Sequence, residues 1–305
     1  MNILNKEELI MDFKQKLKEY QEIINSELER YLIKEECYEK VLNDSIEYSL
    51  MAGGKRLRAI LVLDVYKMFK SANYKEAMPY AIALEMVHNF SLIHDDLPEV
   101  DNDDFRHGKP TNHKKFNHPT ALLAGDALFN RAYIVMSNDL IQNRENLENK
   151  LKVLNEFSIA VERMIAGEYL DTELEGKKIT SEMLQYIHEN KTGALLKLSV
   201  RMGAILAGAD EENLNKISNF AEKIGLAFQI KDDILAEEGD PKIMGKPVGN
   251  DKKHEKCTYV SIYGLEGAKN KLEKITNEAL EILNIYGDEA KFLRLLAEYI
   301  KDRNK

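Results

Sequence analysis

Hydrophobic and polar residues follow the period of an α-helix along almost the whole chain. In the stretch 84–95, for example, Leu84, His88 and Asp95 lie on one helix face. The same pattern predicts helices over about 6–32, 35–51, 56–70, 74–97, 119–139, 144–174, 181–207, 211–237, 256–263, 266–285 and 287–302. Because no segment alternates convincingly with the period of a strand, the sequence predicts an all-α fold.

Composition agrees with a helical bundle built as one domain. The chain has 305 residues, of which 44% are hydrophobic and 31% charged, and it has only 16 glycines and 6 prolines. The longest interruptions, around 98–118 and 239–255, contain candidate ligands and lack the Ser/Gly composition of linkers. We interpret them as active-site lids and predict a single domain over residues 1–305.

Charge and hydropathy limit the possible partners. The N-terminus has no apolar core of signal-peptide length, and no apolar run reaches the roughly 18 residues of a membrane span. We therefore expect a cytoplasmic protein without stable membrane insertion. A net charge of −9 argues against nucleic acid as a partner. Cys37 and Cys257 have no catalytic motif around them, and we interpret both as reduced thiols.

Two acidic clusters end long helical patterns. One runs from Asp95 to Asp101, and the other contains Asp232 and Asp233. Mg²⁺ prefers carboxylate oxygens and leaves coordination positions for substrate phosphates. A continuing helix would rotate Asp101 away from Asp95, but Pro98 forbids that helix, so we expect Asp101 to fold back from a loop. One such cluster alone would be interpreted as a solvated helix end.

Basic residues are concentrated near these clusters. The segment 53–58 begins with two glycines that free the backbone and continues with Lys55, Arg56 and Arg58. Other cations follow the two acidic clusters: Arg106, Lys109, Lys114, Lys115, Lys246 and Lys256. In an acidic chain, this concentration indicates an anionic ligand. The two clusters and their basic neighbours together predict a site for Mg²⁺ and diphosphate.

The motifs resemble those of short-chain trans-prenyl diphosphate synthases, particularly bacterial farnesyl diphosphate synthases. The resemblance starts at about residue 40 and rests on AGGKRLR, LIHDDLPEVDNDDFRHGKPTNHKKF, LLAGDAL, HENKTGALL, GLAFQIKDDIL and EGDPKIMGKPVG. It implies a helical bundle of the isoprenoid synthase type with a central active-site cavity, and a homodimer. The implied reaction joins isopentenyl diphosphate to dimethylallyl or geranyl diphosphate and gives farnesyl diphosphate (C15) and pyrophosphate.

The resemblance also implies roles for single residues. The implied ligands of three Mg²⁺ ions are Asp95 and Asp101 with Asp96 in support, and Asp232 with its neighbour Asp233. The implied cations around the allylic diphosphate are Arg106, Lys191 and Lys246. The expected isopentenyl diphosphate and other substrate contacts are Lys55, Arg58, His88, His107 and Lys256. Thr192 and Gln229 match groups that face the allylic carbon, and Asp171 matches an outer metal-shell carboxylate.

Four positions depart from the family pattern. His107 replaces an arginine, Glu168 a glutamine and Ala236 an aspartate, and Ala59 stands where proline is expected. Ala236 removes a possible oxygen on the Asp232 face of the helix. Glu168 adds a charge that either strengthens metal binding or repels diphosphate. These departures leave open a weakened enzyme or a non-catalytic partner subunit that binds diphosphate.

The residue expected to bear on product length is Phe90, which lies five residues before Asp95 and is followed by the small Ser91. This combination resembles the bacterial farnesyl type, in which the aromatic ring limits the elongation pocket. Helix geometry turns Phe90 about 140° from Asp95, so a core phenylalanine remains an alternative, as does a geranylgeranyl (C20) synthase. A terpene cyclase is disfavoured because its second motif normally has a hydroxyl residue where Ala236 stands.

Overall fold

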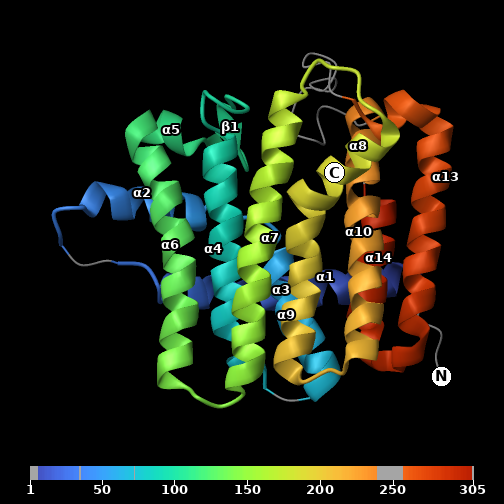
Figure 1. Ribbon diagram of the computed structural model, residues 1–305, viewed down its shortest axis with the longest axis horizontal. Helices are drawn as coiled ribbons and strands as arrows, with labels where there is room; N and C mark the ends of the chain where they lie inside the picture. Colours follow the sequence, from blue (N-terminus) through green and yellow to red (C-terminus); the bar gives the residue numbers. More distant parts are fainter. Residues whose placement is uncertain (1–5, 34–35, 72, 239–256, 304–305) are drawn as a thin grey trace.

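The computed structural model describes residues 6–33, 36–71, 73–238 and 257–303, and it confirms the all-α fold (Figure 1). The long helices are α1 (Lys6–Glu29), α2 (Lys40–Leu50), α3 (Leu57–Lys70), α4 (Met78–Asp95), α6 (His118–Gln142), α7 (Leu147–Glu173), α8 (Ser181–His188), α9 (Ala194–Ala207), α10 (Glu211–Glu238), α13 (Tyr259–Ile282) and α14 (Lys291–Asp302). Shorter elements are the 3₁₀ segments Tyr74–Glu76 and Leu283–Ala290, helix α5 (Asn112–Lys115), and the strands β1 (Phe105–Arg106) and β2 (Lys109–Pro110).

Some predicted boundaries are wrong for local reasons. The helix expected from residue 35 begins at Lys40, after a turn in which the Lys40 N–H donates to the Cys37 carbonyl at 3.3 Å. By contrast, the break expected between the helices over 256–263 and 266–285 is present inside α13, because Gly264 has a non-helical backbone there, with φ 69° and ψ 163°. Thr258 begins this element with a capping box.

The β1–β2 hairpin was not predicted. Its strands have only two residues each, too few to show a strand period, and the pairs are Phe105 with Pro110 and Arg106 with Lys109. The turn residues His107 and Gly108 both have positive φ, at 52° and 75°. Two such residues close a tight turn whose twist matches the paired strands. The hairpin therefore fixes the direction of Arg106 and His107.

The predicted helix 181–207 is interrupted by a π-helical turn, Glu189–Gly193, between α8 and α9. This turn packs against α7 and α10. A β-carbon on Gly167 of α7 would lie 2.2 Å from the Lys191 backbone nitrogen, so only glycine lets the two backbones approach this closely. Single π turns inside helices are rare and often occur at functional sites.

Helix packing aligns the ends that carry the two acidic clusters. Helix α4 packs on α6, α3 on α9, and α10 on α13, and α1 and α2 cross behind the upright helices (Figure 1). In that view, α4 and α10 both end at the upper side, where the hairpin and α8 also lie. The core extends from Phe13 to Ile300. No helix in the described ranges is long and apolar enough to cross a membrane.

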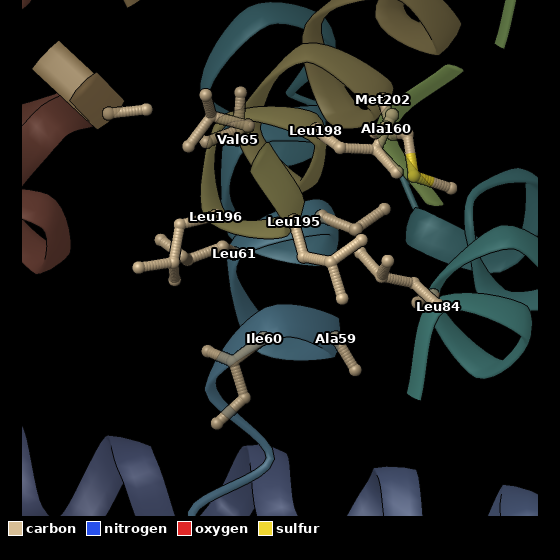
Figure 2. Packing of buried hydrophobic residues seen from close by; sticks show 14 of the residues in the cluster. Ala59, Ile60, Leu61, Val65, Leu84, Ala160, Leu195, Leu196, Leu198 and Met202 are labelled. Atoms are coloured by element: carbon tan, nitrogen blue, oxygen red, sulfur yellow. The ribbon is translucent and has the colours of Figure 1, made fainter. Parts of the chain in front are cut away.

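The centre of the core joins α3, α4, α7 and α9. In Figure 2, Leu61 of α3 lies with Leu196 of α9, and Leu195 of α9 lies on the side of Leu84 of α4. The backbones of α3 and α9 also approach closely, since a β-carbon on Gly203 would lie 2.5 Å from the Val62 carbonyl oxygen. This packing supports the helices that carry the site.

Candidate active site

The first acidic cluster folds back on itself as the sequence predicts. Helix α4 ends at Asp95, and the chain turns through Pro98 so that the Asp101 N–H donates to the Asp95 carbonyl at 2.9 Å. The Val100 N–H also donates to the Leu97 carbonyl at 2.9 Å. The loop thus brings Asp101 back to the helix end from which a continuing helix would have carried it away.

Asp95 lies in a partly buried acidic environment. The pKa of its carboxyl is raised to about 8, mainly by burial and also by the charges of Glu168 and Asp101, while Lys191 and Arg106 act in the opposite direction. The carboxyl is therefore poorly compensated in this state. A divalent cation would relieve that repulsion, because oxygen ligands of high negative charge suit a hard cation.

The buried Asp96 and the partly exposed Arg106 form an ion pair between the end of α4 and the hairpin. The Arg106 Nε donates to both carboxylate oxygens of Asp96 at 2.8 and 2.9 Å, and its Nη2 donates to Oδ1 at 2.6 Å. Burial alone would lower the pKa of Arg106, but the bond with Asp96 raises it. Asp96 thus orients a cation at the cluster, in keeping with its expected supporting role.

Lys191 projects from the π turn between two carboxylates of α7. Its Nζ donates to Glu168 at 2.9 Å and to Asp171 at 2.6 Å. Burial would lower the pKa of Lys191, but these carboxylates raise it. Burial also raises the pKa of Glu168, although Lys191 opposes that shift. The residue that departs from the family pattern, Glu168, therefore helps to orient Lys191.

We expect Gly167→Ala to destabilise the protein by about 1–3 kcal/mol, because the new methyl group would meet backbone at the π turn and the packing must shift. The displacement should also lower turnover, since Lys191 and Thr192 lie on that turn. Thermal unfolding and steady-state rates measure both effects. Gly193→Ala is the matched control, because its β-carbon would meet the His188 carbonyl at an ordinary 3.4 Å. Equal stability of the two variants would contradict the packing argument.

The basic segment 53–58 lies beside α4 and the hairpin. The Arg58 Nη1 lies 3.0 Å from the His88 Nε2, and burial lowers the pKa of Arg58 to about 10. Burial and the Arg58 charge hold the pKa of His88 well below its ordinary value. Neutral His88 therefore accepts a hydrogen bond from Arg58. The Lys55 ammonium lies 5.4 Å from the centre of the Tyr299 ring.

His107 lies next to this basic segment. A β-carbon on Gly54 would be 3.6 Å from the His107 Nε2. His107 also lines a small cavity together with Asn89, Asp96 and Arg106. The hairpin thus brings together Arg106 and His107, which the sequence assigned to two different diphosphates.

The second acidic cluster has protein partners. The Asp232 Oδ1 accepts from the Arg303 Nη2 at 2.5 Å, and the Asp233 Oδ2 accepts from the Tyr259 backbone N–H at 2.6 Å. Asp233 thus holds the start of α13. Arg303 was not predicted, because a basic residue near the C-terminus gives no signal of a contact with α10.

The structure leaves some predicted contacts undecided. Thr192 lies on the π turn and Gln229 on α10, and the π turn packs against α10. Lys246 and Lys256 lie outside the described residues. In the described part of the chain, no three His, Cys, Asp or Glu side chains are already arranged to hold a metal ion.

Phe90 lies under the first cluster. The ring is 7% exposed, and its centre lies 5.1 Å from the rings of both His94 and Phe129. The aromatic row continues from Phe129 to Tyr133 and Phe157. This position is compatible with the wall of a hydrocarbon pocket and with core packing.

Comparison with known proteins decides the family. Residues 39–295 match the polyprenyl synthetase family profile. The chain belongs to the polyprenyl synthetase family. It is 42% identical over 265 residues to farnesyl diphosphate synthase of Bacillus subtilis (strain 168), with 86% of this chain and 89% of the relative covered. It is also 42% identical over 262 residues to geranylgeranyl diphosphate synthase of Cyanophora paradoxa, with 86% and 87% covered.

Solved structures agree with this assignment. An FPP/GFPP synthase from Zymomonas mobilis superposes with a TM-score of 0.84 at 30% identity, with 96% of this chain and 99% of that chain covered. In this fold, α4 and α10 end on the same side of the bundle (Figure 1). Within it, Glu168 beside Lys191 and His107 beside Gly54 are the departures that lie at the described site.

Proposed function

We propose that this protein is a Mg²⁺-dependent prenyltransferase that joins isopentenyl diphosphate to dimethylallyl or geranyl diphosphate and forms farnesyl diphosphate. The main support is the site at the end of α4, where the acidic Asp95 and Asp101 lie within electrostatic range of Arg106 and Lys191. The farnesyl diphosphate synthase from Bacillus subtilis, 42% identical, supports the same activity. We further propose one polyprenyl synthase domain over residues 1–305 and a cytoplasmic location.

The donor set fits magnesium. We propose that Asp95 and Asp101 ligate two ions and that Asp232, with its neighbour Asp233, serves a third. The raised pKa of Asp95, about 8 because of burial and acidic neighbours, supports this assignment, since a cation would favour the ionised form. When bound, Mg²⁺ supplies positive charge to the leaving pyrophosphate. Asp232 must first exchange its bond with Arg303 for the metal.

The side chains of the site hold the two substrates in position and stabilise the charge that develops in the reaction. Arg106 and Lys191, with Lys246, hold the allylic diphosphate and stabilise the negative charge that develops as pyrophosphate leaves. Lys55, Arg58 and His88, with His107 and Lys256, hold isopentenyl diphosphate. Its double bond attacks the allylic carbon, which Thr192 and Gln229 face, and a proton then passes to pyrophosphate. No protein nucleophile takes part in this reaction.

A C20 product is the second candidate. The geranylgeranyl diphosphate synthase from Cyanophora paradoxa is as similar to this chain, at 42% identity, as the farnesyl relative. Product chromatography after incubation of the purified chain with both substrates and Mg²⁺ separates C15 from C20. The same experiment tests the non-catalytic alternative, because a diphosphate-binding subunit would form neither product.

We also propose a homodimer. Helix α6 lies at one edge of the bundle (Figure 1). It also carries an exposed apolar row. Its members are Leu122, Leu123, Ile134 and Ile141, with exposed fractions from 41% to 68%. Such a row suits a second copy of the chain, because exposed apolar surface favours burial in an interface.

We expect the affinity for isopentenyl diphosphate to weaken as pH rises, through His107. An imidazole has an ordinary pKa of about 6.5, and a bound diphosphate would raise it by favouring the charged form. The attraction is therefore present at low pH and lost as pH rises through the raised pKa. The KM for isopentenyl diphosphate should increase between about pH 6.5 and 8.5 more steeply than in His107→Arg.

The arginine variant is the matched control for this pH dependence. Its guanidinium stays charged throughout the range, and it shares every other titrating group with the unsubstituted protein. Both proteins are measured with Mg²⁺ saturating at each pH, so that metal binding does not contribute to the difference. Parallel KM profiles would show that His107 does not contact the diphosphate.

A further inference from the structure

Arg56 lies inside the basic segment 53–58, which the sequence predicts to bind an anionic ligand. Its side chain, however, is too deeply buried to contact such a ligand. The side chain is only 2% exposed. The backbone of Arg56 has φ 52°, in the left-handed region that residues with a β-carbon rarely adopt. Gly53 and Gly54 before it also have positive φ, at 116° and 106°. The segment is thus held in an unusual conformation that needs external support.

The Arg56 guanidinium supplies that support through three helices. Its Nε donates to the Asn25 Oδ1 of α1 at 2.9 Å, and its Nη1 donates to the Glu85 Oε1 of α4 at 3.2 Å. Its Nη2 donates to the Leu50 carbonyl, at the end of α2, at 2.5 Å. The pair with Glu85 is fully enclosed, because the Glu85 side chain is only 3% exposed.

These bonds cross-link the segment to the same face of α4 as the expected ligand contacts. Glu85 and His88 are three residues apart on α4, and they pair with Arg56 and Arg58 respectively. Helix α1 adds a second support, since the Gln21 Nε2 lies 3.4 Å from the Gly54 carbonyl and 3.2 Å from the Lys55 carbonyl.

We propose that Arg56, Asn25 and Glu85 are positioning residues that preorganise the segment 53–58 for isopentenyl diphosphate. They hold Lys55 and Arg58 in place before the ligand arrives, so that binding does not have to order the loop. This inference rests on the proposed function, because it takes Lys55 and Arg58 as diphosphate contacts. It assigns α1, which lies outside the recognised motifs, a part in substrate binding.

The test compares two substitutions of Asn25. Asn25→Leu keeps the size but removes the oxygen that accepts from Arg56, and Asn25→Asp keeps an acceptor. We expect Asn25→Leu to raise the KM and the calorimetric Kd for isopentenyl diphosphate by about tenfold. The KM for geranyl diphosphate and kcat should change less than about threefold. Asn25→Asp should restore both constants, and Arg56→Met should exceed the effect of Asn25→Leu if it folds.

A structural control separates positioning from general stability. Arg201 forms a comparable pair with Glu156, with bonds of 2.6 and 2.7 Å between α9 and α7. Arg201→Met should lower the melting temperature without changing the Kd for isopentenyl diphosphate. If Asn25→Leu lowers the melting temperature but leaves that Kd unchanged, the positioning role is wrong.

The calorimetric Kd also separates this inference from the proposed function. Unsubstituted protein that binds isopentenyl diphosphate but forms no product would contradict the prenyltransferase activity, and the Asn25 pair would still decide the role of the loop. Unsubstituted protein that does not bind isopentenyl diphosphate at all would overturn both.

Discussion

Replacing Asp95 with alanine is expected to lower turnover by about 10²-fold or more, the loss seen when a preorganised charge-stabilising group is removed. Asp95 ends α4, and Asp101 folds back to it through the bond between the Asp101 N–H and the Asp95 carbonyl at 2.9 Å. The substitution would remove a carboxylate that we propose binds Mg²⁺, and raised Mg²⁺ should restore little of the rate. Steady-state kinetics over a range of Mg²⁺ concentrations measure both effects.

Asp104→Ala is the control for Asp95→Ala. Asp104 lies in the same acidic stretch, but its side chain is exposed and pairs with Lys114 at 2.8 Å. We expect this variant to retain turnover, because exposed ion pairs contribute little. A near-normal rate for Asp95→Ala at ordinary Mg²⁺ would show that Asp95 is only a buried helix end.

Replacing Phe90 with alanine is expected to change the main product from C15 to C20 or longer. The ring is almost fully buried between His94 and Phe129, and its loss leaves space in the direction of Phe129 and α6. An apolar cavity of that kind suits one more five-carbon unit, since hydrocarbon is readily accepted by apolar space. Chromatography of the dephosphorylated products measures the chain length.

Phe69→Ala controls for the loss of an aromatic ring as such. Phe69 packs edge-on against Tyr286, with ring centres 5.6 Å apart, near the C-terminal end of α3. Removing either ring should destabilise the protein by at most about 3–5 kcal/mol, the usual cost of replacing a buried phenylalanine with alanine. Only Phe90→Ala should lengthen the product. If this variant folds, remains active and still stops at C15, Phe90 is core packing.

Periodicity predicted the long helices because tertiary packing of one apolar face is what stabilises them. It could not predict the π turn at Lys191, since the sequence of a π turn looks helical. The turn depends on contact with Gly167, 24 residues earlier, whose missing β-carbon admits the Lys191 backbone. The hairpin that carries Arg106 was missed for a different reason, because its two-residue strands are too short for a pattern.

The sequence predicted those parts of the candidate site that depend only on the local backbone. Pro98 ends α4 and so predicts the return of Asp101, which the structure confirms. The direction in which a side chain points depends on contacts with residues far away in the sequence, so the local pattern does not predict it. Arg56 was grouped with Lys55 and Arg58 as a cation for an anionic ligand, but it is buried against Glu85. The pair of Asp232 with Arg303 joins residues 71 positions apart, and no sequence motif predicts this contact.

The most direct test of the proposed activity is product analysis with the purified full chain. The protein is incubated with isopentenyl diphosphate and either dimethylallyl or geranyl diphosphate, with Mg²⁺ or with a chelator, and the dephosphorylated products are separated by chromatography. We predict farnesol as the main product from both allylic substrates, and none when the metal is removed. Absence of any condensation product in the presence of Mg²⁺, from protein that is folded, would contradict the prenyltransferase assignment.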